Sequence, residues 1–391
     1  MKVNQIYTLL NSVTSEILGD SVIVNEDLSN VVSIGESISD SNNIDNYVKS
    51  LINHIGRVIF VNRPYAGSVP SVLMDSWEFG SILEKVSCVL PEAKENSEWD
   101  LQDGQSYDTG IFYKPKVNAK FFNNKVTFEI PMSFTVKQVK ESFSDANQLN
   151  GFYSMLYDSI DKSMTIKIDS LVERCINSMV ANTLISDFPS ITDGNYSGVT
   201  GNKAVNLLKL YNDTMGSTLT KDKCLTTPEF IRFATFTINT YKQRLTKISK
   251  LFNIGKTEKF TSGDFLNIVI LSDLLEASKT YLLADTYHES KLELKGNIST
   301  IPYWQGSGTG YAFEDITKIN VKVNTESGVK TVETNGILAV IFDRDAIGVC
   351  NQEKRVTMAY NAKGEFYNNY FKFDCSYYTD LNENFIVFFV A

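Results

Sequence analysis

The amino-acid sequence predicts an α+β fold, and three observations predict it. Apolar residues between positions 147 and 182 recur at steps of three or four, which is typical of one very long helix. Helix-like and strand-like stretches then alternate from about 190 to 335, as in a mixed α/β domain. From residue 336 to the end, nearly every segment has the spacing of a strand.

Composition limits the classes of function. The chain has 391 residues, 43% of them hydrophobic, so it can bury a core in two or three domain-sized units. The formal net charge of −9 argues against a protein whose main task is to grip nucleic acid, because neutralising phosphates needs clustered Lys and Arg. A container that merely surrounds DNA is not excluded.

The cysteines and the N-terminus indicate the compartment. The five cysteines are dispersed, odd in number and never in a C-x-x-C spacing, so we expect reduced and mostly buried thiols in a cytosolic setting. The first residues do not have the pattern of a secretory signal, and no stretch approaches the length of a membrane span. We therefore expect a soluble protein that is made and stays inside a cell, with no membrane partner.

The N-terminal 65 residues have the composition of an extended arm. Apolar residues over 3–18 have helical spacing, and Gly19 follows as a plausible helix end. Residues 20–48 are rich in Ser, Asn, Asp and Glu with isolated Val and Ile, which is not the pattern of a packed layer. We interpret residues 1–65 as an N-terminal arm.

Residues 66–145 contain a polar segment that follows an apolar stretch at 82–90, with strands predicted at 109–113 and 125–135. Its charges are sorted in order along the chain: acidic residues come first, opposed only by Lys94, and lysines follow without an acid among them. The acids are Glu92, Glu95, Glu98, Asp100, Asp103 and Asp108, and the lysines are Lys114, Lys116, Lys120 and Lys125. This order predicts a long projecting two-stranded hairpin with an acidic leg and a basic leg.

Two interpretations of the hairpin stay open. Charge runs usually face solvent, so the legs of a surface hairpin can simply pair with each other. Alternatively, the hairpin lies across a neighbouring subunit of complementary charge. In that case the inter-subunit contacts are expected at Glu95, Glu98, Trp99, Asp100, Asp103, Lys114, Lys116 and Lys120.

The predicted long helix dominates the unit at 146–189. Its apolar stripe consists of Phe152, Leu156, Ile160, Met164, Ile168, Leu171, Cys175 and Met179. A helix over 147–182 would be roughly 50 Å long at 1.5 Å per residue. Such a helix needs something large to lie against, and we expect a sheet.

The central and C-terminal parts make up the units 190–335 and 336–391. After a loop at 187–201 we expect helices at 203–213, at 273–287 and from Pro228, which follows a threonine cap and precedes an acid. Strands are expected at 266–271, 290–301, 337–342, 355–360, 367–378 and 385–390. A turn at 361–364 contains Gly364, which can take a positive φ.

No catalytic, cofactor-binding or metal site is predicted, and we expect no enzyme. Only His54 and His288 are present, without a nucleophile motif beside them. The Gly-rich stretch at 306–310 precedes a strand instead of the helix that a phosphate site needs, so we interpret it as a loop tip between strands. Asp343 and Asp345 flank Arg344 directly after an apolar strand, which indicates a turn that closes a sheet.

The order of parts resembles the major capsid proteins of tailed phages, with the Hong Kong 97-like fold. Two local sequences add to the resemblance, WEFG at 77–80 and ILAVIFDRDAIG at 337–348. The resemblance implies an N-arm and an E-loop, here at about 90–132, that embrace neighbouring subunits. It further implies a P domain built from strands and the spine helix 147–182, an A domain at 190–335, and a C-terminal segment that closes both domains.

By this resemblance the chain is a major capsid protein that self-assembles into an icosahedral head around double-stranded DNA. The implied partners are itself, in pentamers and hexamers, a portal, and possible scaffolding or decoration proteins. The implied location is the virion, after assembly in the host cytoplasm. The Asn-, Tyr- and Phe-rich composition resembles small short-tailed phages of low-GC Gram-positive hosts. No residue is assignable to the self-crosslinking chemistry of some family members.

Three rival hypotheses make different predictions. A phage tail or receptor-binding protein predicts trimers with exposed aromatic residues. A soluble hydrolase or transferase predicts a pocket that gathers His288 or the 306–310 loop. A bacterial encapsulin-type compartment shares the capsid fold and predicts an inner pocket for a cargo peptide.

Overall fold

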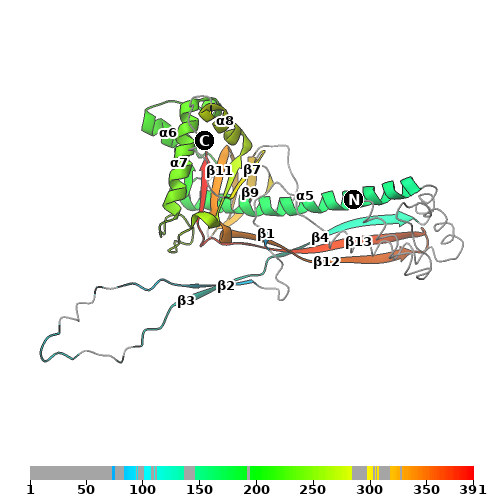
Figure 1. The fold of residues 1–391 in the computed structure, drawn as a ribbon, viewed down its shortest axis with the longest axis horizontal. Coiled ribbons are helices and arrows are strands. Elements are labelled where there is room, and N and C mark those ends of the chain that lie inside the picture. The colour runs from blue at the N-terminus through cyan, green and yellow to red at the C-terminus, as the bar shows by residue number, and fades with distance from the viewer. Residues whose placement is uncertain are drawn as a thin grey trace.

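The computed structural model shows an elongated molecule with a hairpin projecting from one end (Figure 1). It describes residues 73–74, 83–93, 95, 101–106, 110, 112–135, 146–191, 194–283, 297–302, 304, 306–307, 318–325 and 328–391. The predicted N-terminal arm and both histidines lie outside these residues. Within them, the fold combines a long helix over one sheet with a second sheet that is covered by shorter helices.

The long helix α5 spans Ala146–Asp187 and has 42 residues. At 1.5 Å per residue its length is about 63 Å. The helix predicted at 147–182 is therefore confirmed and continues to Asp187. The predicted apolar stripe is buried from Ile160 onwards, including Met164, Leu171 and Met179.

A four-stranded sheet lies along α5, in the order β1-β12-β13-β4. Its strands are β1 (Leu73–Met74), β12 (Ile347–Asn361), β13 (Phe366–Thr379) and β4 (Lys125–Thr135). The long strands pair antiparallel, and only the short β1 runs parallel to its neighbour. Phe128, Phe371 and Phe373 belong to the same buried cluster as the α5 stripe, so the helix packs on the apolar face of this sheet (Figure 1).

A five-stranded sheet forms the second unit, in the order β5-β14-β11-β6-β7. The strands are β5 (Ala204–Asn206), β14 (Phe385–Phe389), β11 (Ile337–Asp343), β6 (Leu266–Leu271) and β7 (Asn297–Ile301). Alternate residues of β14 face opposite ways: Phe385 and Val387 join the α5 cluster, whereas Ile386 and Phe388 join a second cluster. Because both faces are covered, the central strands read as continuous apolar runs.

Three helices cover the second face of this sheet: α6 (Leu207–Met215), α7 (Pro228–Leu245) and α8 (Ser272–Leu283). The predicted start of a helix at Pro228 is confirmed, with Thr227 at the N-cap position. The prediction of a helix from 203 is wrong at its beginning. Ala204–Asn206 pair with β14 as a strand, and this parallel pairing delays the helix to Leu207.

The remaining elements are short or peripheral. A three-stranded sheet, in the order β10-β9-β8, consists of β10 (Gly328–Asn335), β9 (Lys318–Thr325) and β8 (Gly306–Ser307). Among the described residues, 3-10 helices are present at η2 (Lys221–Thr226), η3 (Gly263–Phe265) and η4 (Arg344–Ala346). The chain therefore enters β8 at the start of the Gly-rich stretch, and residues 308–310 lie outside the described residues.

Two predicted turns are present, one with an unexpected backbone. The Asp343 carboxylate accepts a hydrogen bond from the Asp345 backbone N–H and caps η4, which confirms a turn after the apolar strand. The turn at 361–364 is also confirmed. However, the positive φ lies at Glu365, at 52°, and not at Gly364.

The cysteines lie where mostly buried thiols were expected. Each of the five cysteines lies outside a disulfide, and four of them are buried, whereas Cys88 is exposed. Within the described part of the chain, no helix is both long and apolar enough to cross a membrane.

Candidate inter-subunit surface

The projecting element is a hairpin whose base is a two-stranded antiparallel ribbon. β2 (Leu83–Cys88) pairs with β3 (Val117–Phe122), with Leu83 opposite Phe122 and Cys88 opposite Val117. Beyond this base both legs leave the body, as Figure 1 shows at the lower left. The sequence placed the hairpin at about 90–132, whereas the ribbon begins at Leu83 and ends at Phe122. The prediction that the hairpin reaches residue 132 is wrong, because β4 pairs with β13 in the four-stranded sheet.

The strand predicted at 109–113 is also wrong for its described residues. Gly110, Phe112 and Tyr113 are not part of a strand, and the strand on this leg begins only at Val117. Two adjacent apolar residues beside a turn signal are easily interpreted as part of a strand. In the structure Phe112 and Tyr113 are exposed on an irregular leg, so this apolar pair does not mark a strand.

Successive side chains of β2 and β3 point to opposite faces of the ribbon, and this alternation directs two lysines toward the body. Along β2, Lys85 is half-buried between the exposed Glu84 and Val86. Lys120 lies directly opposite Lys85 on β3 and is less exposed than its neighbours. Because side chains of directly opposite residues share a face of the ribbon, both ammonium groups approach the body together.

An ionic cluster receives these lysines, formed by Lys85, Lys120, Lys259, Asp380 and Glu383. Lys85 Nζ lies 3.0 Å from Asp380 and 2.6 Å from Glu383, and Lys120 Nζ lies 2.8 Å from Asp380. Lys259 Nζ contacts the same Glu383 oxygen at 2.8 Å. The two carboxylate side chains are only 3% and 6% exposed, so the base of the hairpin is fixed to the connection between β13 and β14.

The pKa shifts agree with a cluster that is charged at neutral pH. Burial favours the neutral form of Asp380, but hydrogen bonds from Lys120, the Asn382 N–H and Lys85 outweigh it and lower the pKa of Asp380 below its ordinary value. Burial likewise disfavours the charge on Lys85. Its contacts with Glu383 and Asp380 outweigh that burial and raise the pKa of Lys85.

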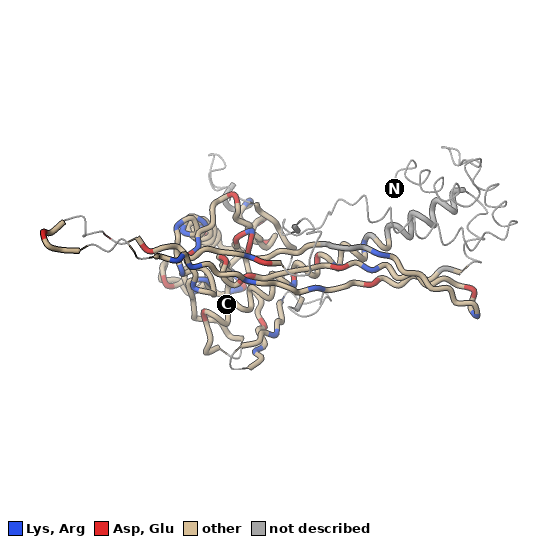
Figure 2. Tube along the Cα trace, turned by 90° about the horizontal axis from the view of Figure 1, so that it is seen from below, with Lys and Arg blue, Asp and Glu red and all other residues tan. Residues whose placement is uncertain are grey.

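Beyond the base, the two legs carry the predicted opposite charges on exposed side chains. Of the eight predicted contact residues, Glu95 and Asp103 are exposed on one leg, Lys114 and Lys116 on the other, and Lys120 belongs to the ionic cluster. The other three, Glu98, Trp99 and Asp100, lie outside the described residues. Figure 2 shows acidic residues toward the far end of the hairpin and Lys and Arg near its base.

The legs do not neutralise one another within the described residues. There, Glu92, Glu95 and Asp103 form no ion pair with Lys114 or Lys116. Next to the strands, the legs are joined by a backbone hydrogen bond from the Val89 N–H to the Lys116 carbonyl, at 2.9 Å. The charged side chains of both legs that the structure describes beyond the base are therefore exposed to solvent.

Apolar side chains on the same hairpin are also uncovered. Phe112 is 85% exposed, Tyr113 80% and Leu101 74%. Sequence reasoning singled out charges here and missed these residues. The signal was available in the sequence, because Phe112 and Tyr113 directly precede Lys114 and Lys116 in a segment that is otherwise mostly polar. Large exposed apolar groups that cluster on one element mark an interaction surface.

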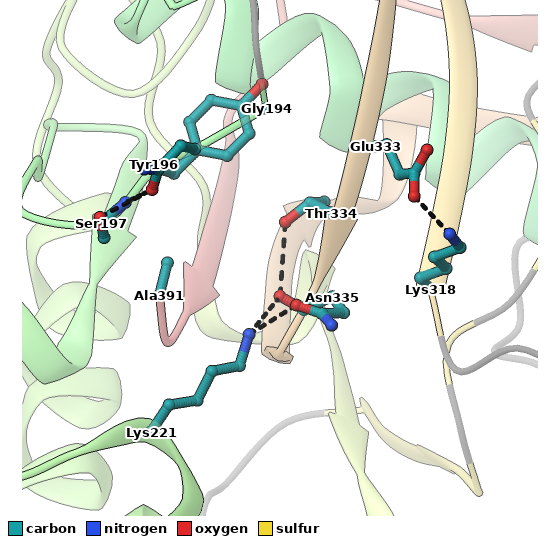
Figure 3. A pocket seen from close by; sticks show the side chains of 10 residues that line it. Gly194, Tyr196, Ser197, Lys221, Lys318, Glu333, Thr334, Asn335 and Ala391 are labelled. Carbon is teal, nitrogen blue, oxygen red and sulfur yellow. Dashed lines mark hydrogen bonds and ion pairs between the residues drawn. The ribbon is translucent and has the colours of Figure 1, made fainter.

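A pocket elsewhere bears on the enzyme hypothesis. A cavity of about 290 Å³ lies where the loop 194–197 approaches β9, β10 and the chain end at Ala391 (Figure 3). Its polar side chains satisfy one another: Lys221 donates to Asn335, and Lys318 pairs with Glu333. Neither Gly306 nor a nucleophile with an adjacent base lines it, and the described residues contain no group of three metal-ligating side chains.

Comparison with known proteins gives one family. A family model described as "Phi29-like phage major capsid protein" matches residues 10–389. In solved structures, a chain of the capsid structure of Staphylococcus phage Andhra is 10% identical, with a TM-score of 0.50, and the match covers 85% of this chain and 87% of that one. A chain in the structure of the head fiber and inner core protein gp22 of native bacteriophage P68 is 9% identical, with a TM-score of 0.51, 85% and 88% of the two chains being covered. Comparison with curated proteins gave no match.

Proposed function

This chain belongs to the Phi29-like phage major capsid protein family, and from that premise we propose how it builds the phage head: copies tile into a closed icosahedral shell around double-stranded DNA. The observation that carries the proposal is the projecting hairpin. Its aromatic side chains at Phe112 and Tyr113 are 85% and 80% exposed, which is unfavourable in a subunit that stays alone.

The hairpin acts as the E-loop and crosses a sister copy. Its base is held by buried carboxylates, so the ribbon leaves the body in a defined direction. Its legs bury little against their own subunit and gain apolar and ionic contacts only from a neighbour. Contacts of this kind are individually modest, and a shell built from many of them assembles cooperatively.

The remaining parts take the roles that the resemblance implies. The helix α5 with the four-stranded sheet is the P domain, with α5 as the spine. The strands β5, β6 and β7 and the three helices belong to the A domain at 190–335. Residues 336–391 close both domains, because β11 and β14 complete the five-stranded sheet and β12 and β13 belong to the four-stranded one. Residues 1–65 form an arm that also contacts neighbours.

The proposed partners are those that the resemblance implies. The subunit associates with itself in pentamers and hexamers, and a portal is a further partner. Scaffolding or decoration proteins are further partners. DNA is enclosed without sequence-specific contacts, which accords with the net charge of −9. The subunit works without cofactor or catalysis, assembles in the host cytoplasm and resides in the virion.

Electron microscopy of the purified chain tests this function. The chain is expressed alone and together with the other head proteins of its phage. Closed particles of uniform size are the expected result. Stable trimers would favour a tail or receptor-binding protein, and a persistent monomer in both settings would overturn the proposal.

A hairpin deletion tests the role of the E-loop. Replacing residues 91–114 with a short Gly-Asn turn keeps β2, β3 and the ionic cluster, so the subunit is expected to fold. We expect no closed particles from this variant, while Glu276→Gln on the exposed surface of α8 assembles normally. If the shortened chain formed particles as the unaltered chain does, the hairpin would not be the E-loop contact.

A further inference from the structure

A second surface of the molecule is strongly basic and has no assigned role. Between residues 230 and 263 the chain has seven Lys and Arg residues and one acid, Glu258. The part of it from 242 to 260, here called the basic edge, runs from the end of α7 through the following loop. Arg244, Lys247, Lys250 and Lys256 are all exposed there.

The charges of the basic edge are only partly balanced inside the subunit. Lys250 pairs with Glu258 at 3.1 Å, and Lys259 belongs to the ionic cluster. Lys247 and Lys256 have no acidic partner among the described residues. A surface with this excess of cations favours a partner that brings acidic groups.

Apolar side chains are exposed within the same stretch. Ile248 is 47% exposed, Leu251 55% and Phe260 56%. A surface that only contacts DNA backbone needs cations and polar groups and gains little from exposed Leu and Phe. The mixture of cations and apolar groups therefore favours a protein segment with matching chemistry over nucleic acid.

The acidic leg of the hairpin has that matching chemistry. Glu92, Glu95 and Asp103 are exposed acids, and Leu90 and Leu101 beside them are 50% and 74% exposed. The acidic leg therefore presents the charge that the basic edge lacks, together with apolar groups for Ile248, Leu251 and Phe260 to contact.

The two surfaces cannot meet within one subunit. Lys85 and Lys259 bind the same Glu383 oxygen, so the start of the hairpin already lies beside the basic edge. Glu92 follows Lys85 by seven residues on a leg that runs away from the body, which is roughly 23 Å at about 3.3 Å per residue (Figure 1). The acidic leg is carried away from its own basic edge, and only another copy can bring the two together.

We infer that the basic edge, residues 242–260, receives the acidic leg of the hairpin of a second copy of this chain. This inference rests on the proposed function and names the surface that the hairpin contacts. In the assembled shell each subunit then gives its acidic leg to one neighbour and accepts an acidic leg on its basic edge, so the contact is heterologous and closes into rings.

A charge-exchange experiment on the full chain tests the inference. One variant carries Glu92→Lys, Glu95→Lys and Asp103→Lys, a second carries Lys247→Glu and Lys250→Glu, and a third carries all five changes. Each of the first two places like charges at the contact, and we expect particle yield to fall about tenfold or more. The third restores opposite charges, and its yield is expected within about threefold of the unaltered chain.

Controls separate this contact from other causes of failure. The altered residues are exposed, so circular dichroism and thermal unfolding of the subunits are expected to be unchanged. Combining Lys247→Glu and Lys250→Glu with Lys114→Glu and Lys116→Glu on the basic leg is expected to give no rescue. Normal yield from the Lys247→Glu, Lys250→Glu variant, or no gain in the five-change variant, would overturn the inference.

Two further outcomes are distinguishable. If the Lys247→Glu, Lys250→Glu variant assembled normally and its particles held less DNA, the basic edge would contact DNA, and the inference would be overturned. If the unaltered chain formed no particles under the same conditions, the proposed function itself would fail, before any variant was compared.

Discussion

Lys85 and Lys120 lie directly opposite one another on the β2–β3 ribbon, and both ammonium groups contact the carboxylate of Asp380, at 3.0 and 2.8 Å. Two like charges on opposite residues of a ribbon repel each other unless an acid lies between them. Asp380 fills that position and comes from the connection between β13 and β14. The direction of the hairpin therefore depends on residues that are about 260 positions apart in the chain.

Asp380→Ala is expected to loosen the hairpin and to destabilise the subunit. The change leaves two neighbouring lysines without their shared acid, and removing one partner of a buried ion pair is costly. Both lysines can turn partly toward water, so we expect a loss of about 1–3 kcal/mol in the free energy of unfolding. Chemical denaturation measures the loss, and faster limited proteolysis near Cys88 reports the loosened base.

The matched control for Asp380→Ala is Glu276→Ala, which removes a solvent-exposed partner of Lys279 on α8. Exposed pairs of this kind contribute little, so the expected change is within about 0.5 kcal/mol. Equal effects of the two substitutions would show that the ionic cluster does not fix the hairpin.

Phe112→Ser combined with Tyr113→Ser is expected to block assembly and to leave the isolated subunit stable. Both side chains are almost fully exposed, so their loss removes little buried area from the monomer. We expect the midpoint of thermal unfolding to shift by no more than about 2 °C. Particle yield, counted by electron microscopy, is expected to fall to background.

Phe371→Ala provides the opposite pattern as a control. Phe371 is 1% exposed in the core beneath α5, so its truncation is expected to cost about 3–5 kcal/mol in folding stability. Normal assembly of the Phe112→Ser, Tyr113→Ser variant would show that these aromatic residues do not contact a neighbour.

Salt is expected to slow the first stage of assembly. Attraction between the acidic legs and basic surfaces steers the encounter, and the screening length falls from about 10 Å at 0.1 M salt to about 3 Å at 1 M. We expect the initial rate, followed by light scattering, to drop several-fold over this range. A variant with Glu92→Gln, Glu95→Gln and Asp103→Asn is expected to start slower and to depend less on salt. Equal salt dependence in both chains would contradict the electrostatic steering.

Local sequence patterns predicted an element correctly where the residues of that element alone determine its structure. The stripe from Ile160 to Met179 predicted the long helix because its period of three to four is a property of the helix alone. The threonine and proline before Glu229 likewise predicted the start of α7. Such signals need no knowledge of the rest of the fold.

Local sequence patterns gave wrong predictions where pairing with a segment far away in the sequence determines the structure. Residues 204–206 read as helix, but β14, about 180 residues later, recruits them into a sheet. Residues 125–132 read as part of the hairpin, and only their pairing with β13 assigns them to the body. The candidate surface shows the same division. Charge order revealed the two legs, whereas the ionic cluster joins Lys85, Lys259 and Glu383 from three separate parts of the chain.

Gly336→Ala is expected to be more damaging than Gly328→Ala, although both glycines have positive φ, at 85° and 116°. A Cβ at position 336 would lie 2.5 Å from the Val390 carbonyl oxygen, where backbone pairing between β11 and β14 leaves no room. At Gly328 a Cβ would meet nothing within 4 Å. We expect losses of about 3 kcal/mol and about 1 kcal/mol respectively, measured by chemical denaturation. Similar losses would mean that the strand end tolerates the shift.

Glu173→Gln is expected to stabilise the subunit at alkaline pH and to have no such effect in acid. Burial, together with the charge of Asp169 one helical turn earlier, raises the pKa of Glu173 to about 7. Between about pH 4.5 and 7 the folded state therefore holds a proton that the unfolded chain has released, so stability falls as pH rises through this window.

Glutamine has no charge to desolvate at position 173, so the Glu173→Gln variant is expected to lose that pH dependence. We expect a gain of about 1–3 kcal/mol in unfolding free energy at pH 8, measured by denaturation, and none at pH 4. Glu129→Gln serves as the control, because Glu129 on β4 is an exposed partner of Lys372 on β13. It is expected to change stability little at either pH. A Glu173→Gln variant that was less stable than the unaltered chain at pH 8 would show instead that the carboxylate is held by a favourable contact along α5, and that its burial is not a cost.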